Sequence, residues 1–338
     1  MTARIQRKLP ASVEQDIERL CGLVAHRPKE IRTAGREQIA AWLYQWWYCT
    51  SRLPVAEAGE GAHALRGRTD LSPALRVALA SASSWQKDWI AMHVSPDGRC
   101  ILGRGNDRRE LQPGEYANIA RPGCPLAPGD LVAIRAKLDW TDQPTGFWYA
   151  QSAAGVPDEP RMRVYFSVHA QHVGIVLHAI TATLDEIGVR YLLKCPFRPA
   201  EFTRVDSLIV YLRRDDWERA GEPLAASARN VSQHLRPESP PLTCIAAPGM
   251  SYAQDPGNKQ SFGESRCHAL AAGVMHLMAV GYRSYTHARG VLVEALCAAG
   301  IDPLCPWNVL TCPKEPECPH GTSSASETSR PRWSATLS

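Results

Sequence analysis

Basic and aromatic side chains recur on apolar segments in the middle of the chain, where they could transfer protons and bind an anion. One of these segments, RMRVYFSV, alternates between apolar and polar residues as a strand requires, so Arg163 and Tyr165 point to the same side. A later apolar segment carries Lys194 between two apolar neighbours. Lysine acts as a base only when it is neutral, which burial or neighbouring cations promote. These residue types could support acid–base chemistry on an anionic substrate without a metal or a nucleotide.

Simpler interpretations exist for each of these residues. From composition alone, Lys194 is a lysine at a strand end whose ammonium group reaches solvent. His169 and His172 follow the first strand and could act as acids in place of Tyr165. For either histidine, a surface position or a helix start is the more common role.

A helix and two more strands must position these residues. Apolar residues at helical spacing begin at Val173 and end before Gly188, where glycine is typical of a helix C-terminus. Two further strands, VRYLLKC and SLIVYL, follow it. The order of strand, helix and strand predicts neighbouring strands joined by a crossover. That arrangement would bring Tyr165 close to Lys194.

A second region with potential for anion binding lies further along the chain. Ser261 and Glu264 form a capping box that predicts a helix start. Arg266 follows within the first turns, where free backbone amides and the helix dipole favour an anion. This location suits a phosphate.

Four segments together resemble a known family: RVYFSV, KCPFR, FTRVDSLIVYL and AQDPGNKQSFGESR. They resemble the Hop-type type III effector family of plant-pathogen origin, whose relatives occur in class V lanthipeptide and thioamitide pathways. The resemblance covers roughly residues 147–306, and its SFGxxR element is the most specific part. Those relatives are thought to be phosphothreonine and phosphoserine lyases. The resemblance therefore implies β-elimination of phosphate from a precursor peptide of the RiPP class, giving dehydroalanine or dehydrobutyrine.

The resemblance also implies roles for individual residues. Lys194 would be the base, and Arg163 and Tyr165 stand where phosphothreonine lyases have a Lys-x-His pair, so they would bind phosphate and act as the general acid. Tyrosine, with a pKa of about 10, is a weaker acid than histidinium and would need nearby cations. Asp206 and Asp255 would orient arginines, although the first could be a cap and the second a turn residue. The phosphate- and substrate-binding set is Arg163, Arg204, Arg266, Asp206 and Asp255.

Partners follow from the same resemblance. No nucleotide-binding motif is visible in the chain, so a separate kinase, which could form a complex with this protein, would phosphorylate the leader-bearing precursor peptide. We expect no cofactor and no metal: the intervals between Cys305, Cys312, Cys318 and His320 are unlike the paired cysteines of structural zinc sites. Two alternatives stay open. The protein could be an effector lyase that acts on host phosphoproteins, or a phosphopeptide-binding module without turnover.

Composition limits the remaining classes. The chain has 338 residues, 44% of them apolar, a net charge of +4 and 11 cysteines. The mild charge does not indicate a nucleic-acid partner, and the cysteines are mostly in apolar segments as expected for free thiols in a reducing compartment. The sequence shows neither a signal peptide nor an apolar stretch long enough to span a membrane, so we predict a soluble cytoplasmic protein.

The predicted fold class is α+β, with a helical N-terminal region, a small β unit and a mixed sheet flanked by helices. The expected parts are residues 1–88, 89–155, 156–304 and a largely disordered tail, 305–338. The second helix contains Trp42, Trp46 and Trp47. These tryptophans most simply form a packed aromatic seam, and the alternative is a groove for a partner peptide.

Overall fold

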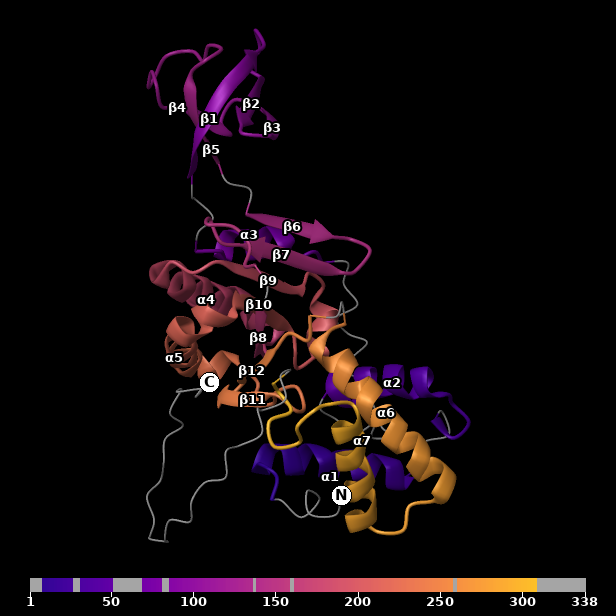
Figure 1. Cartoon of the computed structure of the whole chain (residues 1–338). Coiled ribbons are helices and arrows are strands. Elements are labelled where there is room, and N and C mark those ends of the chain that lie inside the picture. The colour runs from indigo at the N-terminus through magenta and orange to yellow at the C-terminus, as the bar shows by residue number, and fades with distance from the viewer. Residues whose placement is uncertain are drawn as a thin grey trace, which may run out of the picture.

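The α+β class is confirmed by the computed structural model, in which the described part of the chain contains seven α-helices and two antiparallel sheets (Figure 1). The structure describes residues 8–26, 31–50, 69–80, 85–135, 138–158, 161–257 and 260–308. Most of the polar, glycine-containing segment at 54–70 lies outside these ranges, as do Cys312, Cys318 and His320 of the zinc set that we considered.

A seven-stranded sheet forms the centre of the molecule, in the order β11-β12-β8-β10-β9-β7-β6. Its strands are β6 (Asp139–Asp142), β7 (Phe147–Gln151), β8 (Arg161–Phe166), β9 (Tyr191–Pro196), β10 (Leu208–Arg213), β11 (Cys244–Ala247) and β12 (Met250–Gln254). Strand β10 lies between β8 and β9 and is antiparallel to both. The strands of the predicted crossover are therefore parallel to each other but one strand apart, and the sheet is antiparallel where we expected a mixed one.

In the described part of the chain, three helices cover one face of this sheet and bury the apolar side chains that point to it. They are α3 (Ser72–Ala78), α4 (Val173–Ile187) and α5 (Arg214–Asn230). Val164, Phe166 and Leu193 point into this layer, as the alternation of the sequence predicted. Gly188 ends α4 with a φ of 73°, which confirms the predicted glycine C-cap.

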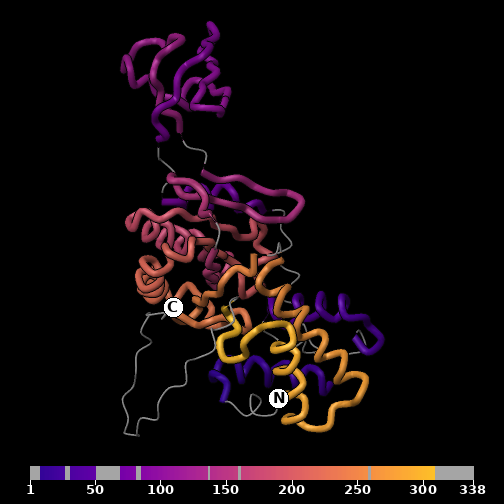
Figure 2. Tube along the Cα trace, in the orientation of Figure 1, coloured from indigo at the N-terminus to yellow at the C-terminus, as the bar shows by residue number. Residues whose placement is uncertain are grey.

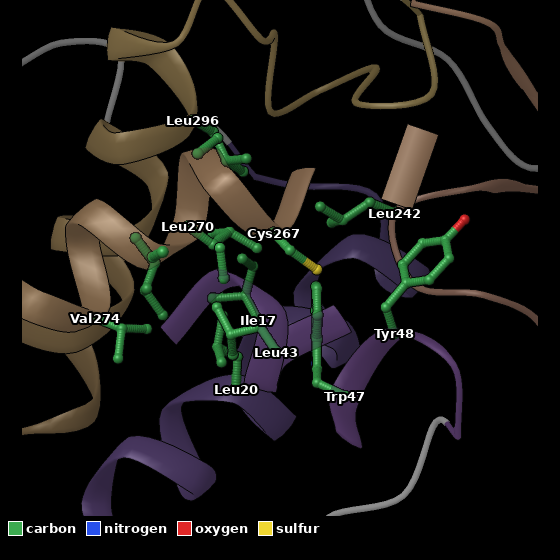
Figure 3. Close-up of a cluster of buried hydrophobic side chains, with 14 of the residues drawn as sticks. Ile17, Leu20, Leu43, Trp47, Tyr48, Leu242, Cys267, Leu270, Val274 and Leu296 are labelled. Carbon is green, nitrogen blue, oxygen red and sulfur yellow. The ribbon is translucent and has the colours of Figure 1, made fainter. Parts of the chain in front are cut away.

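Four helices of the described ranges cover the opposite face of the sheet and bury the side chains that point to it. They are α1 (Ala11–His26), α2 (Arg36–Leu43), α6 (Phe262–Val280) and α7 (Tyr285–Ala298). Tyr165, Ile209 and Tyr211 join the apolar cluster of these helices. Figure 3 shows Tyr48 at one end of the cluster, with its hydroxyl pointing away from the other labelled side chains. Because both faces are covered, β8 is almost fully buried, although its alternation of apolar and polar residues is typical of a half-buried strand.

A separate five-stranded sheet stands beyond β6 at one end of the molecule (Figure 2). It contains β1 (Trp85–Val94), β2 (Cys100–Arg104), β3 (Asp107–Leu111), β4 (Tyr116–Asn118) and β5 (Leu131–Arg135), in the order β3-β2-β1-β5-β4. We had extended this β unit to residue 155. Strands β6 and β7 instead pair with the large sheet through β9, so the small sheet ends near residue 135.

Helix α1 is attached to the large sheet's end by a mostly buried carboxyl group. Asp16 Oδ2 accepts a hydrogen bond of 2.8 Å from the backbone N–H of Leu242, a residue with a positive φ of 61°. Burial raises the pKa of Asp16 to about 7, because the loss of hydration outweighs the hydrogen bond from Leu242 and the charge of Arg19. The folded protein therefore binds this proton more tightly than the unfolded chain, whose aspartates have a pKa of about 3.9.

Because the pKa of this carboxyl group is raised, we expect the stability of the protein to depend on pH. Its contribution is fully present below about pH 4 and is lost as the pH rises toward 7. Asp16→Asn removes the titration, so its free energy of unfolding should rise relative to wild type by roughly 2–4 kcal/mol between pH 4 and pH 8. Urea unfolding of both proteins at several pH values measures this difference. Parallel pH profiles would show that Asp16 has an ordinary pKa.

No helix in the described ranges has the length and apolar character needed to cross a membrane.

Candidate functional site

The chain leaves α2 in a π-helical segment, Tyr44–Tyr48, which the sequence did not predict. The wider turn stacks the rings of Tyr44 and Tyr48, with centroids 5.5 Å apart and planes at 10°. The Tyr44 hydroxyl accepts a hydrogen bond of 3.2 Å from Arg204 Nη2. The backbone N–H of Val205 also donates to the carbonyl of Cys49, at 2.7 Å. Short π-helical segments frequently occur at functional sites, and this one joins the N-terminal helices to the large sheet's loops.

A pocket of about 800 Å³ opens beside this segment. Its walls come from α2 and the π-helical segment, the turn between β6 and β7, the 3-10 segment Pro199–Thr203 and the start of α6. The lining residues used below are Glu37, Tyr44, Trp46, Phe147, Glu201, Arg204, Glu264 and His268. Of the site residues predicted from the sequence, Arg204 is the one that lines this pocket.

Arg204 is held in place by Asp206, the ion pair that the sequence suggested. Arg204 Nε and Nη2 donate to the two carboxylate oxygens at 2.8 and 2.9 Å. Burial alone would lower the pKa of Arg204, but Asp206 outweighs burial and raises it. The guanidinium therefore stays charged at the pocket wall, where it can bind an anion.

Lys194 does not line the pocket itself but contacts the ring of Phe147, which does. Its ammonium nitrogen is 4.6 Å from the centroid of the Phe147 ring, a cation–π contact. Lys194 and Tyr165 both pair with Ile209 on β10, so all three side chains point to the same face. Two strand spacings, about 10 Å, separate the backbones of Lys194 and Tyr165. The structure thus brings the two residues into one row, although not into contact.

Arg163 does not line the pocket and forms a buried ion pair. Its Nε donates to Asp255 Oδ2 at 2.9 Å, and the two side chains are only 10% and 11% exposed. The guanidinium carbon lies 5.2 Å from the centroid of the Tyr211 ring. Burial would lower the pKa of Arg163, but Tyr165, Tyr211 and Asp255 raise it. Asp255 occupies the Nε–H of Arg163, so a phosphate would have to bind the remaining N–H groups beside this carboxylate.

Tyr165 is fully enclosed near this pair. Its hydroxyl and that of Tyr48 are buried and have no hydrogen-bond partner within the described part of the chain. Burial raises the pKa of both phenols, and Arg163 partly opposes this for Tyr165. The two residues lie close enough to affect each other's pKa. Tyr165 does not line the pocket.

Gly263 on α6 makes room for the Tyr48 ring. A Cβ atom at this position would overlap three carbon atoms of the ring. We expect Gly263→Ala to lower the free energy of unfolding by about 1–3 kcal/mol, because the ring or the helix must shift. Gly290 in α7 is the matched control: a Cβ there meets nothing within 4 Å. Gly290→Ala should leave stability unchanged or raise it by up to about 1 kcal/mol. If both variants changed the free energy of unfolding by the same amount in urea, the close packing of Gly263 against Tyr48 would be contradicted.

Arg266 stabilises the fold in this structure by binding backbone carbonyl groups. Its guanidinium donates to the carbonyl oxygens of Pro306, at 2.6 and 2.9 Å, and of Asn308, at 2.8 Å. Burial lowers its pKa to about 10. The capping box of α6 is confirmed, since Ser261 and Glu264 bond reciprocally at 2.6 and 3.1 Å. The helix start that we assigned to phosphate therefore already holds a carboxylate.

The segment bound by Arg266 corrects the predicted tail. We placed the start of a disordered tail at residue 305, but residues 305–308 pack on the protein. Trp307 lies against the apolar cluster of α6 and α7, and its carbonyl accepts a hydrogen bond of 2.8 Å from the N–H of Gln254.

The two candidate histidines lie in a cluster of their own. Strand β8 ends at Phe166, before it could carry His169 onto the Arg163 face. The ring of His172 is 4.6 Å from that of His234 and 6.3 Å from that of His169. Burial, followed by the charge of Arg236, lowers the pKa of His169. Neither histidine lines the pocket.

Comparison with known proteins finds a match for the region that holds half of the pocket's lining residues. Residues 142–307 match the model of the HopA1 effector protein family. This region is similar to HopA1 effectors. The predicted resemblance to Hop-type effectors is therefore confirmed for it, and no curated protein sequence matches the chain.

Two solved structures resemble this chain. One is an effector protein from Pseudomonas syringae pv. tomato strain DC3000, with 20% identity and a TM-score of 0.36 over 49% of this chain and 65% of that one. The other is an effector protein from Pseudomonas syringae pv. syringae strain 61, with 14% identity and a TM-score of 0.46 over 89% of this chain and 98% of that one. The first match thus spans less than two thirds of the effector's length.

One wall of the pocket comes from outside the HopA1 region. Glu37, Tyr44 and Trp46 belong to α2 and the π-helical segment, whereas Phe147 and Arg204 lie within residues 142–307. We had considered the tryptophan-rich helix as a core seam or a groove. Trp47 is core, and Trp46 lines the pocket. The two tyrosines four residues apart in YQWWY are the sequence signal that could have revealed this wall.

Proposed function

We propose that this protein is a phosphoserine/phosphothreonine lyase that acts on a kinase-phosphorylated precursor peptide of the lanthipeptide or thioamitide type. The match of residues 142–307 to the HopA1 family and the resemblance of its motifs support this activity. One observation carries the proposal: a pocket bounded by Phe147 has Lys194 at that ring and the charged Arg204 in its wall. A base and a phosphate-binding cation are the two groups that β-elimination needs most.

In the proposed reaction, the neutral amine of Lys194 removes the Cα proton of the phosphorylated residue. The electrons of the C–H bond form the double bond between Cα and Cβ, and the Cβ–O bond breaks. Phosphate leaves with that bond's electron pair, and Arg204 stabilises its charge. The products are dehydroalanine from phosphoserine or dehydrobutyrine from phosphothreonine.

The geometry of the site favours a different general acid from the one that the resemblance implies. Tyr165, the candidate from the resemblance, has a fully buried hydroxyl, whereas Tyr44 lines the pocket and is bonded to Arg204. We therefore assign protonation of the leaving phosphate to Tyr44. Tyr44→Phe should lower kcat more than Tyr165→Phe, and the reverse order would restore Tyr165 as the acid.

The test of function is incubation of the purified protein with a phosphothreonine peptide. A peptide lighter by about 98 Da, the mass of phosphoric acid, that forms an adduct with an added thiol supports the lyase. Phosphate-dependent binding without any change of mass would favour the phosphopeptide-binding module.

A further inference from the structure

The pocket beside the π-helical segment carries three carboxylates on separate elements. Glu37 lies on α2, Glu201 on the 3-10 segment and Glu264 at the start of α6. Arg204 shares the pocket, but its charge is matched by both oxygens of Asp206. His268 Nδ1 lies 3.4 Å from Glu37, and Arg198 lies 3.5 Å from Glu201. Among the lining residues, three carboxylates thus outnumber the single arginine, so the lining carries an excess of negative charge.

An exposed aromatic side chain marks the same pocket. Trp46 is 40% exposed, whereas the adjacent Trp47 is 2% exposed and belongs to the core. The rings of Tyr44 and Phe147 also line the pocket. Aromatic faces beside carboxylates attract a cation that carries an apolar stem, as lysine and arginine side chains do.

We propose that this pocket binds a lysine or arginine of the substrate peptide, together with a neighbouring apolar residue, next to the phosphorylated residue. The phosphate would stay beside Arg204, because the carboxylates repel it elsewhere. An extended chain advances about 3.3–3.6 Å per residue, so the basic residue lies within about three positions of the phosphorylated one. The inference rests on the proposed function for the identity of the reacting residue, but the preference for a basic peptide can be measured separately.

The experiment compares two phosphothreonine peptides that differ only in the three residues on each side, which contain lysine and phenylalanine in one peptide and glutamate and serine in the other. Wild type should favour the lysine peptide by about tenfold in kcat/KM, since three exposed charges each contribute a modest part. The double variant Glu37→Lys/Glu201→Lys should reverse this preference. Glu37→Lys alone, on the surface of α2, should reduce it.

Glu218→Lys is the matched control, because Glu218 is exposed on α5, on the opposite face of the sheet from the pocket. It makes the same change of charge and should preserve the preference. Equal rates for both peptides in wild type, or an unchanged preference in the double variant, would overturn the inference.

A binding measurement separates this inference from the lyase proposal. Fluorescence anisotropy with the unphosphorylated forms of both peptides should show tighter binding of the lysine peptide to wild type and a loss of this difference in Glu37→Lys/Glu201→Lys. If neither phosphopeptide loses phosphate, the lyase proposal fails, whereas this binding difference still supports the pocket's role. No binding of either unphosphorylated peptide would refute it.

Discussion

Lys194→Ala should lose elimination activity by about 100- to 10,000-fold, the usual contribution of a general base. Its ammonium group lies against the ring of Phe147, and the side chain points away from the apolar layer that contains Leu193. Removing the amine therefore takes away the proposed base without leaving a cavity in that layer. The rate of phosphate release under single-turnover conditions measures the effect.

Two further variants make this result specific. Lys194→Arg keeps the positive charge but removes a group that can become neutral, so it should be almost as inactive as the alanine variant. Lys87→Ala alters an exposed lysine of the five-stranded sheet and should retain wild-type activity. Phosphopeptide binding should survive in Lys194→Ala. Wild-type rates in Lys194→Arg would mean that the residue only binds phosphate.

Asp255→Ala should lower the free energy of unfolding by about 3–5 kcal/mol, because it leaves the buried guanidinium of Arg163 without its carboxylate. The surface pair Asp97 and Arg99 has a bond of 2.7 Å, yet both side chains are more than half exposed. Asp97→Ala should therefore change stability little. Urea unfolding of the two variants therefore compares the loss of a buried ion pair with the loss of an exposed one whose N–O distance is nearly the same.

Replacing both members of the buried pair tests the same explanation. Arg163→Met/Asp255→Leu removes both charges and should recover much of the stability that Asp255→Ala loses. If the double variant is as unstable as Asp255→Ala, the loss comes from the turn at Asp255, whose other carboxylate oxygen accepts a hydrogen bond from the N–H of Gly257.

Local patterns in the sequence predicted the elements around the site well. Strict alternation in RMRVYFSV placed Arg163 and Tyr165 on one face, and Gly188 and the Ser261 box marked helix ends that the structure confirms. Helix α3 begins at Ser72, whose backbone N–H donates to the side chain of Asp70. These features depend on neighbours within a few residues, which a sequence displays directly.

Features that depend on distant contacts could not be predicted in this way. The insertion of β10 between β8 and β9 separates Lys194 from Tyr165, and no local pattern specifies strand order. Arg266 binds Pro306, which lies 40 positions along the chain, so its spacing suggested a phosphate ligand instead. The π-helical turn that brings Tyr44 to Arg204 lies outside the region that resembles the family.

The most direct test of the proposed chemistry is the reaction of a phosphothreonine peptide in water labelled with a heavy oxygen isotope. Elimination breaks the Cβ–O bond, so the account predicts released phosphate without solvent oxygen and a dehydrobutyrine peptide. A phosphatase would instead transfer one labelled oxygen to phosphorus and regenerate threonine. Labelled phosphate beside intact threonine would contradict the lyase, whereas unlabelled phosphate beside the alkene would establish it.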